Sequence, residues 1–266
     1  ELVVATKVTG PNAYFNYLRE NLDFSKPVIL DALNKSLQRL QTDYVDIYQL
    51  HWPERNANFF GKRNYVHDSN EQWEDNFKEI IETLDALVKE GKIRHYGVSN
   101  ETSWGLMRHL TESKYNNLTR CKTIQNPYSL LNRLFEINLA EVSIREQIGL
   151  LAYSPLGFGM LTGKYLNGQL PENSRLKLFP QYSRYNSEQS HLLTQKYLEL
   201  AQELNISLTE LSLAFVNHQP FVVGNIIGAT TMSQLRENIG SINVELSDEI
   251  FKKINEIQDL QPNPAP

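Results

Sequence analysis

The stretch FKEIIETLDALVKEGKIRHYGVSN, residues 77–100, places an amphipathic helix directly before a buried strand. Apolar side chains recur at intervals of three and four residues as far as Val88, which is the spacing of one helical face. Gly91 follows, and helices commonly end at glycine because it adopts a left-handed backbone without strain. Residues 93–98 then have the composition of a strand, which delivers Ser99-Asn100 at its end. A helix leading into a buried strand is the repeating unit of parallel α/β proteins.

The same unit recurs on both sides of this stretch, and about six strands alternate with helices. The expected strands are residues 2–6, 45–50, 93–98, 123–125, 149–153 and 223–227. The expected helices are residues 25–40, 77–88, 103–114 and 134–146, with two more before the last strand and two after it. Two long loops, residues 52–72 and 154–185, are expected to be functional. The Pro-rich tail, residues 261–266, is expected to be frayed.

Alternating strands and helices without a linker predict one α/β domain with a parallel sheet over residues 1–266. No G-x-G-x-x-G follows any strand, so a doubly wound dinucleotide-binding sheet is not supported. We expect instead a (β/α)8 TIM barrel, which needs eight units. The first two strands would then lie N-terminal to Glu1, and the printed barrel would be N-terminally incomplete. The alternative is an opened barrel of six units, which would expose strand edges and be unstable without a partner.

Composition restricts the class of protein. The chain has 266 residues, of which 41% are hydrophobic and 21% charged, as in ordinary soluble domains. A formal net charge of −5 argues against general affinity for nucleic acid or anionic membranes, and no apolar run is long enough to span a membrane. The single cysteine, Cys121, excludes an internal disulfide and is expected to be a buried, inert thiol. These features predict a soluble cytoplasmic protein and nothing more specific, and they leave its oligomeric state undetermined.

Polar residues follow the expected strands at their carboxyl ends, where barrel active sites form. They are Lys7, His51, Ser99, Asn100, Gln125, Tyr153, Ser154 and residues 228–231. A lysine on an apolar strand is costly unless it is paired or functional. Taken singly, Lys7 is equally well explained as a solvated strand end, and a lone histidine such as His51 is more often structural than catalytic. The two together at neighbouring strand ends favour a function. Residues 228–231 lead into a helix N-terminus, which is either a phosphate site or a plain helix cap.

These residues lie in segments that resemble, in order, the motifs of the aldo-keto reductase family. The segments are ATK (5–7), YVDIYQLHW (44–52), GVSN (97–100), QNPY (125–128), YSPLG (153–157), GATT (228–231) and QLREN (234–238). The resemblance covers the whole chain and is strongest to the Tas-like branch, which is related to voltage-gated potassium-channel beta subunits. It implies an NADP(H)-dependent oxidoreductase on a (β/α)8 barrel, which reduces aldehydes or ketones to alcohols by direct hydride transfer.

The resemblance also implies roles for individual residues. Lys7 and His51 match the catalytic lysine, which lowers the pKa of a tyrosine acid, and the histidine that orients the carbonyl group. Ser99, Asn100 and Gln125 match residues that hold the nicotinamide carboxamide, and Tyr153 matches the aromatic residue stacked on that ring. The loop that closes over the pyrophosphate is matched by Ser154, Leu156, Gly157, Lys164, Ser174 and Arg175. The adenosine pocket is matched by Gly228, Thr230, Gln234, Glu237 and Asn238. No metal site is expected.

The chain departs from the family pattern in two ways. The family's catalytic aspartate and tyrosine precede the lysine strand and are absent from the printed chain; Tyr14 or Tyr17 is an alternative acid, although both are more simply loop aromatics. Gln234 stands where many relatives carry an arginine for the 2′-phosphate, so the preference for NADP rests on the branch alone. The alternative function is a cofactor-binding regulatory module or an inactive truncated barrel.

The two long loops carry the residues that would shape a substrate pocket. Five aromatic side chains in them suggest an apolar or aromatic carbonyl compound: Trp52, Phe59, Phe60, Phe158 and Tyr182. Three basic residues would instead suit an acidic group, but are more simply explained as solvated surface charges: Arg55, Lys62 and Arg63.

Overall fold

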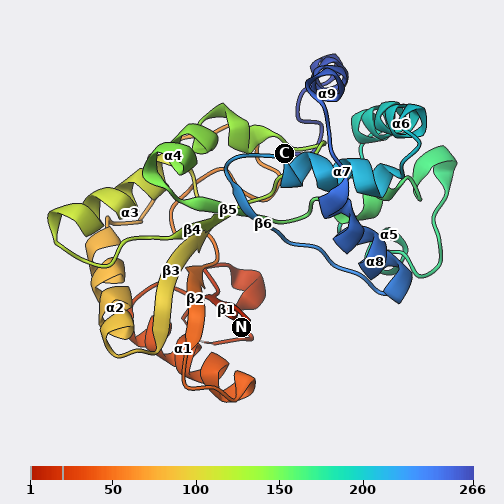
Figure 1. Ribbon diagram of the computed structural model, residues 1–266. Coiled ribbons are helices and arrows are strands. Elements are labelled where there is room, and N and C mark those ends of the chain that lie inside the picture. The colour runs from red at the N-terminus through yellow and green to blue at the C-terminus, as the bar shows by residue number, and fades with distance from the viewer. Residues whose placement is uncertain (1, 20) are drawn as a thin grey trace. The chain divides into compact units, whose positions relative to one another are not determined.

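The computed structural model describes residues 2–19 and 21–266, and the chain forms two compact units (Figure 1). Unit 1 comprises residues 1–125 and 145–148, and unit 2 comprises residues 126–144 and 149–266.

Unit 1 is built on parallel strands that pair in chain order. The strands are β1 (Ala5–Val8), β2 (Val45–Leu50), β3 (Ile93–Ser99) and β4 (Thr123–Gln125). A helix follows each of the first three strands, namely α1 (Lys26–Leu40), α2 (Phe77–Lys89) and α3 (Ser103–Tyr115), and a short 3-10 helix, η1 (Ala13–Phe15), lies in the first loop. Helix α2 lies beside both α1 and α3 (Figure 1). The alternation of parallel strands with helices confirms the predicted α/β class.

Helix α2 shows how the sequence determines this unit. Its apolar face, with Ile81, Leu84 and Leu87 fully buried, is the face that the spacing predicts. The helix stops before Gly91, whose φ of 75° is the left-handed conformation expected of a terminating glycine. The core also contains Cys121, which is buried as predicted, and burial raises the pKa of its thiol to about 12.

Unit 2 contains one pair of parallel strands, β5 (Gly149–Ala152) and β6 (Val222–Asn225). Its α-helices are α5 (Arg175–Leu178), α6 (Glu188–Glu203), α7 (Leu208–Asn217), α8 (Met232–Gly240) and α9 (Asp248–Leu260); α4 (Leu139–Glu146) begins in unit 2 and ends in the segment 145–148 of unit 1. The 3-10 helices are η2 (Leu134–Ile137), η3 (Gly157–Thr162), η4 (Leu166–Gly168) and η5 (Ser241–Asn243).

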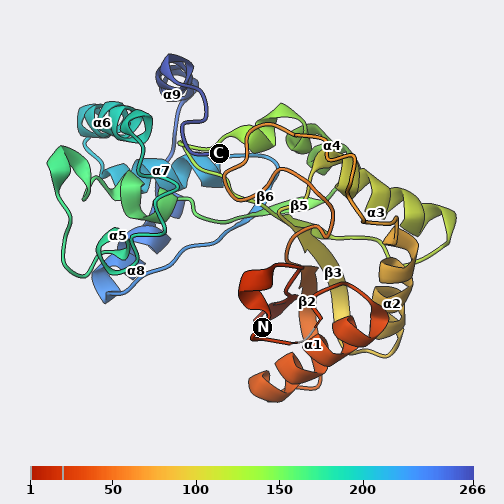
Figure 2. The ribbon, with the colours of Figure 1, turned by 180° about the vertical axis from the view of Figure 1, so that it is seen from behind.

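Helix α7 forms much of the core of unit 2. Every residue from Leu211 to Val216 is buried, and α6 lies beside both α7 and α9 (Figure 2). Ser207 and Glu210 form the predicted capping box at the start of α7, in which each side chain accepts a hydrogen bond from the backbone N–H of the other residue.

The structure corrects several expected boundaries. β1 starts at Ala5 instead of residue 2, because the carboxylate of Asp46 accepts the N–H of Val4 at 2.8 Å in place of a ladder bond. The expected helix over residues 134–146 is divided into η2 and α4 at Asn138, whose φ of −143° is not helical. Asparagine competes with the helix for backbone hydrogen bonds, which suits it to such a break. β6 ends at Asn225, where its pairing with Ala152 of β5 ends, instead of at residue 227.

The C-terminal tail is ordered, and the expectation that it is frayed is wrong. Ala265 is fully buried, and its N–H donates to the carbonyl oxygen of Leu131 at 3.2 Å. Asn263 accepts the N–H of Arg133 at 2.6 Å, and the guanidinium of Arg184 donates to the carbonyl oxygen of Pro266. These contacts join residues that lie far apart in the sequence, so the composition of the tail alone does not reveal them.

Candidate active site

In unit 1 the structure brings together the five residues predicted at the strand ends. His51 follows β2 directly. Ser99 is the last residue of β3 and Gln125 the last of β4, and these two residues are register partners. Lys7 is the third residue of β1 instead of lying at its exit, and it pairs in register with Gln49. Alternate residues of a strand share one face, so Gln49 and His51 point to the same side of the sheet as Lys7.

Hydrogen bonds hold the ends of β2, β3 and β4 to one another. The Ser99 hydroxyl donates to the carbonyl oxygen of Gln125 at 2.7 Å, and the backbone N–H of Asn100 donates to the same oxygen at 3.0 Å. The side-chain amide of Asn100 donates to the carbonyl oxygen of His51 at 2.9 Å. Asn100 has a φ of 53°, a left-handed conformation that asparagine adopts more readily than most residues. The predicted carboxamide-binding residues therefore form one fixed cluster.

The electrostatics of this cluster affect His51 and Lys7 in the same direction. Burial, and secondly the positive charge of Lys7, lower the pKa of His51 to about 4. Burial also lowers the pKa of the Lys7 ammonium group. Within residues 2–19 and 21–266, Lys7 has no carboxylate partner. A neutral imidazole thus lies near a half-buried cation, and can donate one hydrogen bond to an oxygen atom.

Sequence reasoning missed Gln49. Its side chain is fully buried, and neither its amide nitrogen nor its oxygen has a hydrogen-bond partner among the described residues. Its neighbour in β3 is Gly97, where a side chain would collide with Thr123, whose buried hydroxyl also has no partner in the described part of the chain. The alternation of side chains along β2 could have found it, because Gln49 lies two residues before His51.

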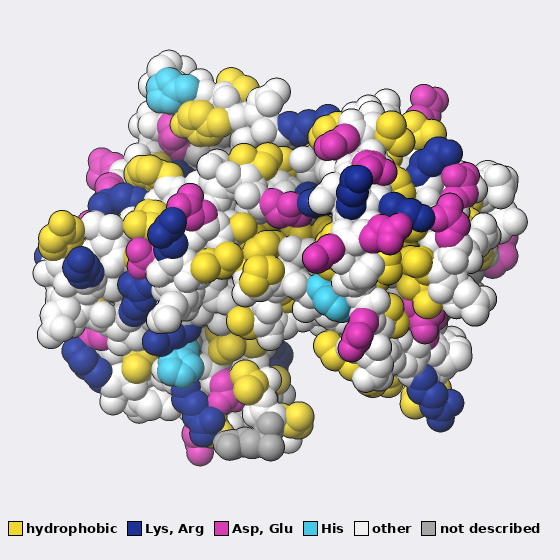
Figure 3. Space-filling view, turned by 45° about the horizontal axis from the view of Figure 1, so that its top comes forward, with side chains coloured by type: hydrophobic (Ala, Val, Ile, Leu, Met, Phe, Trp, Pro, Cys, Tyr) yellow, Lys and Arg dark blue, Asp and Glu magenta, His cyan; other side chains and the backbone are white. Residues whose placement is uncertain are grey.

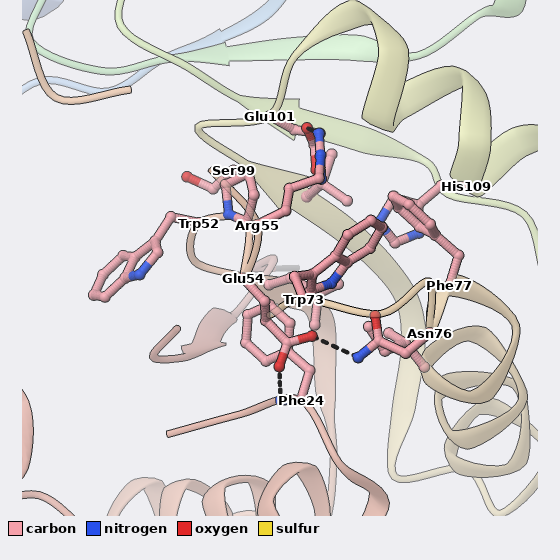
Figure 4. Close-up of a pocket in the computed structure, with 14 residues that line it drawn as sticks. Phe24, Trp52, Glu54, Arg55, Trp73, Asn76, Phe77, Ser99, Glu101 and His109 are labelled. Carbon is pink, nitrogen blue, oxygen red and sulfur yellow. Dashed lines mark hydrogen bonds and ion pairs between the residues drawn. The ribbon is translucent and has the colours of Figure 1, made fainter. Parts of the chain in front are cut away.

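Arg55 is buried, so its expected role as a solvated surface charge is wrong. It lines a cavity of about 20 Å³ with residues from the ends of β2 and β3 and from helices α2 and α3 (Figure 4). Such a volume has room for about one water molecule. In the same cavity the carboxylate of Glu54 accepts hydrogen bonds from the N–H of Phe24 at 2.6 Å and the amide of Asn76 at 2.7 Å (Figure 4). Tyr14 and Tyr17, by contrast, are 78% and 76% exposed, as loop aromatics are.

In unit 2, Tyr153 directly follows β5 and opens a tightly turned segment. Its N–H donates to the carbonyl oxygen of Asn126 at 3.1 Å, and burial raises the pKa of its hydroxyl to about 12. Ser154 and Gly157 have φ angles of 56° and 52°, both left-handed, with Leu156 between them. Gly157 also packs against the ring of Tyr185, so a side chain at that position would be both strained and crowded.

The loop after this turn carries three groups suited to an anion. The hydroxyl of Ser174 is buried and has no partner in the described part of the chain. The ammonium of Lys164 lies 5.3 Å from the ring centre of Tyr165, and the guanidinium of Arg175 lies 4.9 Å from that of Phe158. Neither cation has a carboxylate partner among residues 2–19 and 21–266. Each of these groups is of a kind that binds phosphate, namely a buried hydroxyl without a partner in the described residues and two cations without a carboxylate.

The residues predicted for the adenosine pocket lie just before α8 and along it. Thr231 caps this helix by accepting the N–H of Gln234, so the plain helix cap is present. The Gln234 side-chain oxygen accepts the N–H of Thr230 at 2.9 Å. Asn238 donates to the carbonyl oxygen of Gly228 at 3.3 Å, whereas the carboxylate of Glu237 accepts the hydroxyl of Ser207 at 2.6 Å and so ties α8 to α7.

Two properties of the molecule complete the description. Within the described residues no helix has both the length and the apolar character needed to cross a membrane. On the face shown in Figure 3, side chains of Lys and Arg and of Asp and Glu both occur across the surface.

Comparisons with known proteins agree over the whole chain. The profile of the aldo/keto reductase family matches residues 1–259. Protein tas of Escherichia coli (strain K12) is 46% identical over 272 residues, which covers 100% of this chain and 77% of that protein. An aldo-keto reductase of Babesia bovis is 38% identical, covering 97% of this chain and 95% of that protein. A putative voltage-gated potassium channel subunit beta of Schizosaccharomyces pombe is 28% identical, covering 98% of this chain and 72% of that protein.

Proposed function

The chain belongs to the aldo/keto reductase family, and from that premise we propose that it reduces aldehydes or ketones to alcohols by direct hydride transfer from NADPH. Membership of the family confirms the predicted oxidoreductase class, the (β/α)8 fold class and the relation to Tas-like proteins and channel beta subunits. NADP as the cofactor, a carbonyl substrate, a cytoplasmic location and a single barrel domain over residues 1–266 are parts of the proposal.

The observation that carries the proposal is the neutral imidazole of His51 beside the half-buried ammonium of Lys7. A carbonyl oxygen gains negative charge as it is reduced, and fixed donors or cations in a water-poor site stabilise that charge strongly. His51 is proposed to donate a hydrogen bond to this oxygen and orient it. Lys7 is proposed to hold positive charge beside it and to lower the pKa of the tyrosine acid that the family places ahead of the lysine strand.

Each unit holds residues whose chemistry suits one part of a nicotinamide dinucleotide, the proposed cofactor. When bound, the cofactor supplies the hydride and its two electrons. Ser99, Asn100 and Gln125 provide the amide and hydroxyl groups that match a carboxamide. In unit 2, the orphaned hydroxyl of Ser174 and the cations of Lys164 and Arg175 match a pyrophosphate. The adenosine end is proposed to bind near Gly228, Thr230, Gln234, Glu237 and Asn238, and the nicotinamide ring against Tyr153.

We propose an apolar or aromatic carbonyl compound as the substrate, because an aromatic cluster adjoins His51. The ring of Trp52 lies 4.7 Å from that of His51, and 5.6 Å from the rings of both Phe15 and Phe60. Phe60 is half exposed, and its ring is 5.1 Å from that of Phe59. Flat apolar substrates are held well by such surfaces, since offset and edge contacts between rings are favourable.

The test combines a binding and a turnover measurement on the purified protein. NADPH binding is followed by the change in its fluorescence, and turnover by the loss of NADPH absorbance with benzaldehyde, a straight-chain aldehyde and 2-carboxybenzaldehyde. We expect oxidation of NADPH with benzaldehyde, and its loss in Lys7→Met and His51→Leu variants that still bind NADPH.

The other outcomes separate the alternatives. A protein that neither binds NADPH nor oxidises it contradicts the proposal. Tight NADPH binding with no turnover on any carbonyl compound supports the regulatory cofactor-binding module instead, in line with the relative named as a channel beta subunit. A preference for 2-carboxybenzaldehyde that Lys62→Ala abolishes would favour an acidic substrate.

A further inference from the structure

Arg55 and Glu101 form a buried, two-pronged ion pair in unit 1 (Figure 4). One nitrogen of the guanidinium, Nη1, donates to Oε2 of the carboxylate at 3.1 Å, and the other, Nη2, donates to Oε1. Arg55 is 9% exposed and Glu101 is 5% exposed. A fork of two parallel hydrogen bonds fixes the separation of the two groups and also their shared plane.

The surroundings of the pair are shaped to it. Nη2 also donates to the hydroxyl of Thr102 at 3.1 Å, and the guanidinium lies 4.8 Å from the ring centre of Trp104 and 5.5 Å from that of Phe77. Helix α3 passes the pair at Gly105, where a side chain would collide with both Nη2 and Oε1. The absence of a side chain at Gly105 therefore makes room for the guanidinium and the carboxylate.

The position of the pair connects it to the candidate active site. Arg55 lies four residues after His51, in the loop that leaves β2, and Glu101 immediately follows Asn100 at the end of β3. The bond from the Asn100 amide to the His51 carbonyl joins the same two segments at 2.9 Å. The segments that follow β2 and β3 are thus joined twice, once by the bond from Asn100 to His51 and once by the Arg55–Glu101 ion pair.

Stability alone is a weak reason for such a pair. Removing two charges from water is costly, and replacing a buried ion pair by apolar side chains of similar size is often neutral or stabilising. A bidentate pair does, however, define one geometry where apolar contacts tolerate several.

We infer that the Arg55–Glu101 pair is a positioning element that holds Ser99 and Asn100 in the orientation that binds the nicotinamide carboxamide, and His51 in register with them. The inference rests on the proposed function. Its consequence is that the pair contributes to cofactor affinity and to the rate of hydride transfer without touching the cofactor.

Two sets of variants test the inference. Glu101→Gln keeps the shape of the side chain but leaves the guanidinium without its charge partner. The double variant Arg55→Met with Glu101→Leu removes both charges and fills the space, so that it folds even where the single variant does not. For each protein, the NADPH dissociation constant, kcat, KM for benzaldehyde and the urea midpoint are measured.

The matched control is the ion pair between Arg94 and Asp46, at 2.6 Å, which joins the same two strands, β3 and β2, at their opposite ends. Arg94→Gln disturbs this pair and leaves the hydrogen bond from Val4 to Asp46 in place, so its urea midpoint gives the effect of losing a charged contact between these strands. Since this end of the sheet is remote from the strand ends that carry His51 and Ser99, we expect the NADPH dissociation constant of this variant to equal that of the wild type.

We expect Glu101→Gln and the double variant to raise the NADPH dissociation constant and lower kcat, each by about tenfold or more, because small displacements of binding groups have large effects on reactive geometry. The double variant should do so while its urea midpoint stays near that of the wild type. Unchanged NADPH binding and kcat in the folded double variant overturn the inference alone. A wild-type protein that binds no NADPH overturns the proposed function, and the inference with it.

Discussion

The side-chain amide of Asn100 donates a hydrogen bond of 2.9 Å to the backbone carbonyl oxygen of His51, and so joins the residue after β3 to the residue after β2. Asn100 does this from a left-handed conformation, with a φ of 53°, while it is 4% exposed. One residue therefore supplies both the turn and the connection. The two contributions can be separated by substitution.

Asn100→Gly keeps the left-handed turn but removes the amide, whereas Asn100→Ala removes the amide and also strains the backbone. Losing a bond to a buried carbonyl costs about 1–3 kcal/mol, and the left-handed conformation costs an alanine about 1–2 kcal/mol more. We expect the free energy of unfolding, measured by urea titration, to fall in the order wild type, Asn100→Gly, Asn100→Ala. Equal stability of the two variants would show that the conformation of the turn contributes nothing.

Lys7→Met should raise the pKa of His51, which is about 4 in the native protein. The positive charge of Lys7 is the second cause of the low value, and burial is the first, so the pKa should rise but remain below the ordinary 6.5. Titration of the histidine ring signals by NMR measures it. A His51 pKa that is the same in both proteins would mean that the charge of Lys7 does not act on His51.

The stability of the protein should fall as the pH falls below about 6.5, in part because of His109. Burial, together with the charges of Arg55 and Arg108, lowers the pKa of His109 to about 3. Between these values the unfolded chain binds a proton that the native state excludes, so acid favours unfolding, with a slope of about 1.4 kcal/mol per pH unit for each such group. His51 contributes in the same direction down to its pKa of about 4.

His109→Leu removes the contribution of that residue, since leucine cannot bind a proton. Urea titrations at about pH 5.5 and about pH 4.5 should show that the free energy of unfolding falls by about 1 kcal/mol less in the variant than in the wild type over this interval. An identical loss in both proteins would show that His109 is protonated in the native state as readily as in the unfolded chain.

Ala265→Asp should destabilise the protein by about 2–4 kcal/mol, because it places a carboxylate at a fully buried position next to Leu131. Leu260→Asp is the control, since Leu260 is 62% exposed at the end of α9. Thermal unfolding should show a lower Tm for Ala265→Asp and a value near wild type for Leu260→Asp. If neither substitution changed the Tm, the tail would be frayed in solution, as its composition suggests.

Local patterns predicted the elements whose determinants are local. Helix α2 and strand β3 follow from apolar spacing and from Gly91, and the capping box of α7 follows from Ser207 and Glu210, three residues apart. The residues at the ends of β2, β3 and β4 also followed, because a strand places its last residues wherever the sheet ends. The break at Asn138 escaped because the apolar spacing continues across it.

What sequence reasoning missed depends on partners that are distant in the chain. Arg55 looks like a surface charge until Glu101, 46 residues away, is folded against it. The tail is held by Leu131 and Arg184, more than 80 residues earlier. Gln49 had a detectable signal, a polar residue on a buried strand two positions before His51. The long-range contacts had none.

Cys121 gives this protein a built-in reporter of its own opening. It is the only cysteine in the chain, it is fully buried, and a thiol with a pKa of about 12 is almost entirely protonated at neutral pH. A thiol reagent can therefore reach it only when unit 1 opens, and the rate of its modification under native conditions measures how often that happens. Because Cys121 is inaccessible in the folded protein, a second cysteine introduced at an exposed position such as Tyr115 would be the only thiol that reacts. A fluorophore can therefore be attached there without first removing Cys121.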